Sequence, residues 1–395
     1  MKKIILLAFI ILSLGLVSCK KDKPEIKPLL EVEHSLFVYM PWSTNLTSDF
    51  KQNILDFERA LDVNLLKNNR LIVFFSSSPT EATMFELKYK QGNIVRDTLR
   101  KYQNPVFTTA NGITSILDDL KCSAPAKRYS MIIGSHGMGW LPVAETRMLR
   151  ERDYEKYHWE YEGVPLTRFF GGGTPDVQTE ITALAKGITN AGIKMDYILF
   201  DDCYMSSIEV AYDLKEVTNY LVASPTEIMA YGFPYHIVGK FLIGDVDLRS
   251  VCDGFYNFYS NYEYPYGTIG VTVTAELDNL AAIMKEINQT FVFDMTLLND
   301  IQTMDGYSPV IFFDMGDYIS KLCTDADLLA KFEYQLERTV PSSYHRHTPY
   351  YPTSNGGAIR IIKINAFSGV TISDPSISPK AITTKMETAW YKATH

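Results

Sequence analysis

Cysteine is scarce in this sequence, and no group of cysteines and histidines has the spacing of a metal site. The 395 residues contain five cysteines, which lie far apart instead of in the closely spaced pairs of zinc sites. His345 and His347 would share one face of a strand, but no carboxylate or cysteine partner is identifiable for them. The pair Asp201-Asp202 is a weaker indication of a cation site. We therefore expect no metal and no other cofactor.

Basic residues are fewer than acidic ones, and the sequence has no phosphate-binding loop. Lys and Arg number 38 against 46 Asp and Glu, and the resulting formal net charge of −8 argues against nucleic acid as a partner. The glycine run at 171–173 is not followed by the Lys-Ser/Thr pair of a nucleotide-binding loop. The sequence also contains no internal repeat and no low-complexity segment.

Long apolar runs are missing except at the N-terminus. Lys2 and Lys3 precede an apolar run at residues 4–14, which is short for a membrane-spanning helix. Leu16-Val17-Ser18-Cys19 follows and resembles the lipobox of bacterial lipoproteins. We therefore expect residues 1–18 to be a signal peptide, Cys19 to be lipidated, and residues 19–34 to be a solvated tether. The protein would be exported and anchored to a membrane, on the periplasmic face or at the cell surface; a plain membrane-spanning anchor is the alternative.

Alternating strand and helix patterns predict an α/β fold. Residues 35–40 and 70–75 are apolar runs typical of buried strands, and residues 49–67 between them carry apolar side chains at helical spacing. This alternation implies a mainly parallel sheet with helices on both faces. From about residue 276 onward the pattern is mostly helical, with closing strands at residues 359–362 and 369–372.

The most informative stretch is residues 195–210. An apolar run at 197–200 ends in Asp201-Asp202-Cys203, and Ser206-x-x-Glu209 then has the pattern of a helix capping box. Ligands bind at the carboxyl ends of strands in open α/β sheets, and the positive end of a following helix would favour the thiolate of Cys203. The alternative is a buried structural cysteine, which is a common fate of this residue.

A second strand end carries a histidine. The apolar residues 129–133 run into a polar, glycine-rich turn that contains His136 and Gly137. If both strands are parallel and central, their ends open onto the same edge of the sheet, so that His136 and Cys203 form a candidate base and nucleophile. With Cys19 lipidated and Cys203 free, the other three cysteines can form at most one disulfide.

The apolar run ending in His-Gly, followed downstream by an apolar run ending in Asp-x-Cys, resembles the clostripain family of cysteine peptidases. That family is related in fold to caspases, gingipains and legumains. The resemblance implies a caspase-like catalytic domain at residues 35–265 and a C-terminal region at residues 266–395, mostly helical with closing strands. It also implies a peptidase in which Cys203 is the nucleophile and His136 the acid and base, with no residue identified that orients the histidine. Main-chain N–H groups of Gly137 and Cys203 would stabilise the oxyanion.

Asp201 is the expected specificity residue. Residues two apart on a strand point the same way, so Asp201 and Cys203 share a face and Asp202 points away. By resemblance, Asp201 holds the position of the acid that selects Arg or Lys before the scissile bond; the alternative is a carboxylate paired with a local Lys or N–H. Asp202 stands where relatives more often have a small residue, and its charge would disfavour the thiolate and reduce activity.

The long segment after His136 is an expected site of self-cleavage. Arg147, Arg150 and Arg152 lie close together in it, and relatives are matured by cutting in the corresponding loop. An Arg-selecting enzyme would hold such a loop at high effective concentration. The alternative is that these arginines pair with nearby glutamates on a solvated surface.

The leading hypothesis is therefore a lipid-anchored cysteine endopeptidase that cleaves peptides or proteins after Arg or Lys. A non-catalytic envelope lipoprotein that uses the same fold to bind peptide or glycan is one alternative, and a structural envelope protein without a ligand is another. Because His136, Cys203 and Asp201 are all present, the enzyme is favoured. Some relatives require calcium; the sequence indicates neither such a requirement nor a particular oligomeric state.

The lipobox predicts that the mature chain begins at an acylated Cys19. Intact-mass analysis of protein extracted from a bacterial host membrane should give the mass of residues 19–395 plus the acyl groups, and Cys19→Ala should remove the added mass. An unmodified N-terminus at any other residue would contradict the prediction.

Overall fold

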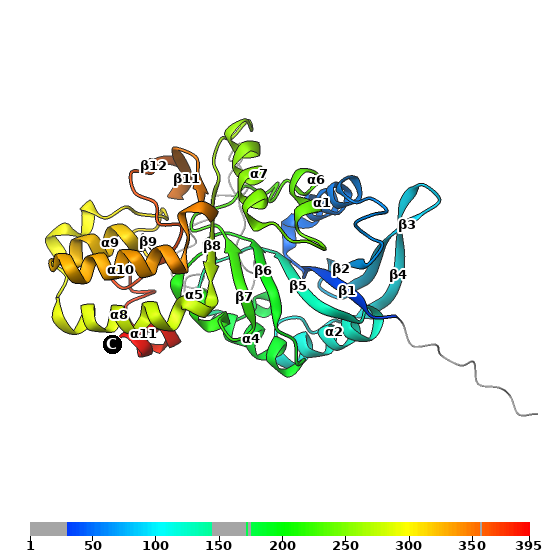
Figure 1. Cartoon of the computed structure of the whole chain (residues 1–395), viewed down its shortest axis with the longest axis horizontal. Helices are drawn as coiled ribbons and strands as arrows, with labels where there is room; N and C mark the ends of the chain where they lie inside the picture. The colour runs from blue at the N-terminus through cyan, green and yellow to red at the C-terminus, as the bar shows by residue number, and fades with distance from the viewer. Residues whose placement is uncertain (1–29, 144–170, 173–174, 356–357) are drawn as a thin grey trace, which may run out of the picture.

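A nine-stranded sheet forms the centre of the computed structural model, which describes residues 30–143, 171–172, 175–355 and 358–395 (Figure 1). Its strands are β1 (Val32–Met40), β2 (Asn69–Ser78), β3 (Glu81–Lys90), β4 (Asn93–Gln103), β5 (Ala126–Gly134), β6 (Met195–Asp201), β7 (Thr218–Ala223), β8 (Thr268–Val273) and β10 (Arg346–His347). The five central strands, in the order β7, β6, β5, β1, β2, are parallel. Antiparallel strands extend the sheet on both sides, with β3 and β4 beyond β2 and with β8 and β10 beyond β7. The predicted mainly parallel sheet is therefore confirmed.

Helices cover both faces of this sheet. The helices are α1 (Thr47–Ala60), α2 (Ala110–Ser123), α4 (Ile181–Asn190), α5 (Ile208–Leu214), α6 (Tyr235–Val238), α7 (Leu248–Ser260), α8 (Leu277–Thr290), α9 (Met315–Leu322), α10 (Ala326–Thr339) and α11 (Ala389–Thr394). Figure 1 shows α1, α6 and α7 on one side of the sheet and α2 and α4 on the other, where α5 packs against α4. Among the described residues, no helix is long and apolar enough to cross a membrane.

Local sequence explains why these helices form where they do. In α2 the Thr109 side chain accepts a hydrogen bond from the Gly112 N–H, which satisfies one of the unpaired donors at the helix start. Ile113, Leu117 and Leu120 then recur at helical spacing and are all buried against the sheet. The strands that they cover are apolar on both faces, as expected for the middle of a parallel sheet.

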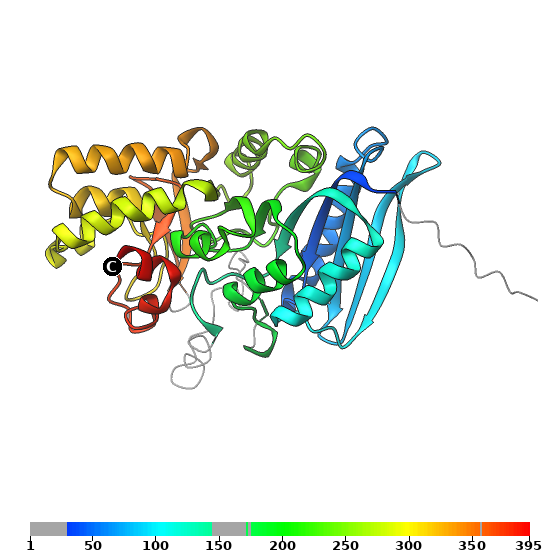
Figure 2. The same ribbon diagram turned by 60° about the horizontal axis from the view of Figure 1, so that its bottom comes forward.

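The C-terminal region packs beyond β8, at the opposite end of the molecule from the β3–β4 hairpin (Figures 1 and 2). It consists of α8 to α11 together with two small antiparallel pairs, β9 (Phe313–Asp314) with β13 (Thr371–Ile372) and β11 (Tyr350–Asn355) with β12 (Ala358–Lys363). The expected division between residues 265 and 266 passes through the main sheet, because β8 and β10 follow it in the chain. The central and C-terminal parts thus share one sheet.

A buried carboxyl group joins α5 to the C-terminal region. Glu209 is fully buried and accepts hydrogen bonds from the Ser373 N–H at 2.8 Å and from the Ser207 hydroxyl at 2.8 Å. Burial, together with the nearby carboxyl of Asp374, raises the pKa of Glu209 to about 7. The folded protein therefore favours the protonated form of this side chain.

This pKa predicts a pH-dependent contribution to stability. At low pH Glu209 is protonated in both the folded and the unfolded state, and its raised pKa does not change the free energy of unfolding. As pH rises from about 4.5 through 7, the unfolded state loses this proton first, and the folded state becomes progressively less stable. Glu209→Gln keeps an acceptor for the Ser373 N–H, and its amide N–H can donate to the Ser207 hydroxyl oxygen. Because it cannot ionise, its free energy of unfolding should exceed that of the wild type by roughly 3 kcal/mol at pH 8 and by little at pH 4.5. Urea unfolding across this pH range measures the difference. Glu216→Gln, at an exposed position, is the matched control, and a Glu209→Gln curve parallel to the wild type would refute the prediction.

Candidate active site

The two predicted reactive residues follow neighbouring strands. In the β5–β6 pair Gly134 lies opposite Asp201, and His136 and Cys203 each come two residues later. Gly137 packs directly on the main chain of Cys203: a Cβ atom at Gly137 would lie 2.4 Å from the Cys203 carbonyl oxygen and 3.1 Å from the Cys203 nitrogen. Only glycine permits so close an approach. The structure thus brings together the His-Gly turn and the Cys turn, as the strand-end argument predicts.

The thiol of Cys203 lies against the loop that follows β7. Its exposed fraction is 1 %. The Ile228 N–H lies 3.3 Å from Sγ and donates to it, while Sγ lies 3.9 Å from the Ile228 carbonyl oxygen. The Ile228 N–H thus holds the sulphur against the loop that follows β7. A main-chain hydrogen bond from the Tyr204 N–H to the Thr226 carbonyl (3.0 Å) holds the two segments together.

The residue after Cys203 has a strained backbone. Tyr204 has φ +59°, in the left-handed region that bulky side chains rarely adopt. Its ring stacks on Phe312 with centroids 5.2 Å apart, and its hydroxyl donates to Glu227 Oε1 at 2.5 Å. Such strain costs about 1–3 kcal/mol and persists only when surrounding contacts hold it. Since Phe312 belongs to the C-terminal region, that region helps to shape the turn that carries Cys203.

An asparagine that the sequence argument did not identify contacts the histidine. Asn45 follows β1, and its Oδ1 atom lies 2.8 Å from His136 Nε2. An amide oxygen only accepts, so Nε2 carries the hydrogen and Nδ1 is the nitrogen that exchanges protons in the neutral ring. β1 pairs directly with β5, so its carboxyl end opens onto the same edge of the sheet. The strand-end rule applied to a third strand would have found this residue.

The two acids before Cys203 face different neighbours. Asp201 is fully buried and accepts from the Phe233 N–H at 3.1 Å and from the Tyr235 hydroxyl at 2.9 Å. Asp202 accepts from the Ser135 N–H at 2.6 Å and from its hydroxyl at 3.3 Å. Asp202 therefore joins the end of β6 to the residue that precedes His136.

The predicted capping box is wrong by one residue. Helix α5 starts at Ile208, and its cap is Ser207, whose hydroxyl accepts from the Val210 N–H at 3.3 Å. The Ser206 hydroxyl instead donates to the Gly369 carbonyl at 2.7 Å, and Glu209 bonds to the C-terminal region. Because four residues separate Cys203 from this short helix, its dipole contributes less to the thiolate than expected.

The described part of the chain leaves out four of the predicted residues and includes three further cysteines. Arg147, Arg150, Arg152 and Cys19 lie outside the described residues. Cys122, Cys252 and Cys323 form no disulfide in the described part of the chain, and only Cys122 is exposed.

The histidines considered for metal binding pack against an aromatic ring. The centroids of His345 and His347 lie 5.4 Å and 4.6 Å from that of Phe367. Burial lowers the pKa of His345. Within the described ranges, no three His, Cys, Asp or Glu side chains are placed to hold a metal ion.

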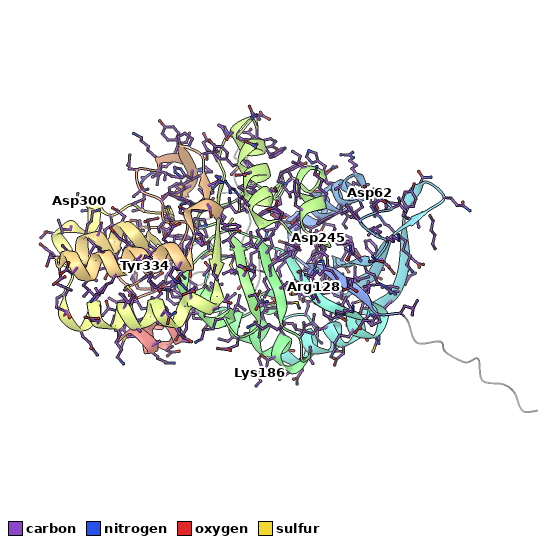
Figure 3. All side chains as sticks on the ribbon, viewed as in Figure 1. Asp62, Arg128, Lys186, Asp245, Asp300 and Tyr334 are labelled. Carbon is purple, nitrogen blue, oxygen red and sulfur yellow. The ribbon has the colours of Figure 1, made fainter. Side chains whose placement is uncertain are left out.

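A cavity of about 490 Å³ lies at the other edge of the sheet. Arg128 and Asp196, at the amino ends of β5 and β6, form an ion pair of 2.6 Å in its wall, and Asp245 lies close to Arg128 (Figure 3). Since His136 and Cys203 follow the carboxyl ends of these strands, the cavity is separate from the candidate site.

Comparisons with known proteins agree with this geometry. The sequence model of the clostripain family matches residues 38–330, and the chain therefore belongs to the clostripain family of cysteine peptidases. A secreted C11 cysteine protease from Bacteroides thetaiotaomicron, "iotapain", is 55 % identical, with a TM-score of 0.84 over 93 % of this chain and 100 % of that one. A search of the curated proteins finds no match.

Two further solved structures are similar. A clostripain from Bacteroides thetaiotaomicron in complex with the peptide inhibitor BTN-VLTK-AOMK is 60 % identical, with a TM-score of 0.55 over 57 % of this chain and 99 % of that one. An inactive zymogen of a C11 protease from Parabacteroides distasonis is 25 % identical, with a TM-score of 0.76 over 93 % of this chain and 99 % of that one.

The Asn45 contact predicts a positioning role. Asn45→Ala should lower kcat for peptide cleavage by about 10-fold or more while changing KM little, because the ring of His136 loses its orientation and fixed tautomer. The acid and alkaline limbs of the kcat–pH profile should also shift. Asn279→Ala, an exposed asparagine, is the control. An unchanged pH profile in Asn45→Ala would show that the contact is structural only.

Proposed function

We propose that the protein is a lipid-anchored endopeptidase that cleaves after Arg or Lys, with Cys203 as nucleophile and His136 as acid and base. The observation that carries the proposal is the packing of Gly137 on the main chain of Cys203, which sets the histidine turn beside the cysteine turn. This arrangement gives a peptide carbonyl one place to meet both groups.

The proposed reaction has two steps. The Cys203 sulphur, its proton passed to His136, attacks the peptide carbonyl carbon, and main-chain N–H groups of Gly137 and Cys203 stabilise the negative charge on the carbonyl oxygen. His136 then protonates the leaving amine, the C–N bond breaks, and a thioester forms. In the second step His136 takes a proton from water, which attacks the thioester; the carboxylic acid leaves and the thiol is restored. Asn45 would keep Nδ1 of the ring directed to these transfers.

Asp201 is the proposed selector for Arg or Lys. An uncharged N–H and a tyrosine hydroxyl donate to it and fix its position at the end of β6. A carboxylate has further lone pairs, so a guanidinium or ammonium that reached it would meet a complete opposite charge in a buried setting. The inhibitor bound to the Bacteroides clostripain supports this proposal, since its peptide VLTK ends in lysine.

Anchoring and self-cleavage extend the proposal. The lipobox at Cys19 supports anchoring, and the description of a relative as secreted supports export. Self-cleavage after Arg147, Arg150 or Arg152 is supported by the relative described as an inactive zymogen and by the 1 % exposure of Cys203, which implies a step that admits substrate. The pieces would stay together because both contribute strands to the main sheet.

Cys203→Ala tests the proposed reaction. This variant should lose more than 1,000-fold in kcat/KM on Arg- and Lys-ending reporter peptides and should resist labelling by an Arg-directed thiol probe. Cys122→Ala, the same change at an exposed cysteine, should behave as wild type. N-terminal sequencing of purified wild type and Cys203→Ala should find a cut after Arg147, Arg150 or Arg152 in the wild type only. Full activity in Cys203→Ala would overturn the mechanism, and cuts in both preparations would assign them to another protease.

The role of Asp201 is tested by Asp201→Asn. The substitution keeps an acceptor for the Phe233 N–H but removes the charge, so preference for Arg over a neutral residue of similar length should fall by roughly 2–5 kcal/mol. Specificity constants for two otherwise identical peptides measure the change. Asp202→Asn is the matched control, since it can slow cleavage of both peptides but should leave their ratio unchanged. An unchanged ratio in Asp201→Asn would exclude Asp201 as the selector.

A further inference from the structure

Four aromatic rings form a partly exposed row beside the candidate site. Tyr231 stacks on Phe258 with centroids 5.1 Å apart and planes at 19°, and Phe258 stacks on Tyr262 at 5.1 Å and 27°. Tyr264 continues the row with an edge contact to Tyr262 at 6.4 Å. All four side chains are partly exposed, and together they form what we call the aromatic platform.

The platform adjoins the segment that contacts the nucleophile. Tyr231 comes three residues after Ile228, whose N–H donates to the sulphur of Cys203 at 3.3 Å. At the other end, Tyr264 comes four residues before Thr268, whose hydroxyl lies 2.7 Å from the hydroxyls of both Ser224 and Thr226. Both ends of the row are therefore within four residues of the 224–228 segment or of a residue that contacts it. The platform thus lies at the same edge of the sheet as the site.

Polar contacts on α1 fix the first ring of the platform. The Tyr231 hydroxyl donates to Asp56 Oδ2 at 2.7 Å, and the Asn53 amide donates to the Tyr231 carbonyl at 2.9 Å. A ring held in this way loses little conformational freedom when a ligand stacks on it, which is why rigid tyrosines serve as binding anchors. The core beneath the platform is already filled by Phe233, Phe255 and Tyr259, all fully buried.

The charge around Tyr262 is negative, whereas beside Tyr231 the carboxylate of Asp56 is paired with Arg59 at 3.1 Å. Glu263 and Asp49 lie close enough to raise the pKa of Tyr262, after burial, which is the largest cause. Stacked rings bordered by carboxylates suit planar side chains, either aromatic rings or the guanidinium of arginine. A neutral, flexible side chain would gain neither interaction.

We propose that the aromatic platform is a subsite for the substrate polypeptide, which binds a planar side chain about three residues from the scissile bond. Three residues from Ile228 to Tyr231 span at most about 11 Å, the reach of about three residues of extended peptide. This inference rests on the proposed function. It adds a determinant of substrate choice that is separate from Asp201 and that acts only on substrates long enough to reach the platform.

Peptides of different length test the proposal. A reporter with a single acylated Arg before the leaving group reports on the Cys203 site alone. Octapeptides with the same Arg carry Trp, Arg or Ser at one position, varied from two to five residues on either side of the scissile bond. Wild type should prefer Trp or Arg over Ser by roughly three- to tenfold in kcat/KM at one of these positions and not at its neighbours.

Platform variants should remove that preference selectively. Tyr262→Ala and Tyr264→Ser should bring the Trp-to-Ser ratio to about one while kcat/KM for the short reporter stays within twofold of wild type. Tyr334→Ala is the matched control, since Tyr334 is a 68 % exposed tyrosine on α10, in the C-terminal region (Figure 3). Tyr264→Ser changes only the outer end of the row, so a folding defect in Tyr262→Ala would not prevent the test.

Two results would overturn the proposal, and they differ from each other. If wild type cleaves the short reporter but shows no preference for a planar side chain, or if both variants keep the preference, the platform is not a subsite and the proposed function stands. If wild type cleaves neither the reporter nor any octapeptide, the proposed function fails and the subsite fails with it.

Discussion

The parallel pairing of β5 with β6 is the constraint on which the rest of the candidate site depends. Register sets Gly134 against Asp201, so the turns that follow emerge side by side. The Asp202 carboxylate then bonds to Ser135 across the gap, and Gly137 lies on the main chain of Cys203. A shift of register would reverse the side chains on one strand and separate the thiol from the histidine.

The C-terminal region takes part in this geometry rather than standing apart from it. Phe312 stacks on Tyr204, the strained residue after Cys203, and the buried Glu209 accepts a hydrogen bond from the Ser373 N–H. Asp305 lies close to Tyr204, and burial raises the pKa of its carboxyl group to about 7. Three main-chain N–H groups donate to that carboxyl and lower its pKa in part. Strain at Tyr204 is thus maintained by residues more than a hundred positions away in the chain.

Residues that a local sequence pattern marks could be predicted, whereas residues whose role depends on a tertiary contact could not. His136 and Cys203 could be found from the sequence because each ends an apolar run, and the run alone identifies a strand end. Asn45 lies 91 residues from His136, and only the same strand-end rule, applied to β1, connects the two in the sequence. By pattern Ser206 is the better cap, because Glu209 follows it by three residues. In the fold Ser206 donates to the Gly369 carbonyl and Glu209 accepts from the Ser373 N–H, which leaves Ser207 to cap the helix. The aromatic row could not be predicted either, because Tyr231 meets Phe258 only once α7 has packed beside the loop.

Because β5 and β6 pair directly, a cut between them would change unfolding from a unimolecular to a bimolecular equilibrium. The chain leaves the sheet after β5 and returns to it at β6, next to the strand it left. In an intact chain these strands separate in a unimolecular event, and the midpoint of unfolding does not depend on protein concentration. If the connection between them is cut, the same sheet becomes the interface of a heterodimer. Its stability then follows mass action, so dilution alone would lower the midpoint of unfolding.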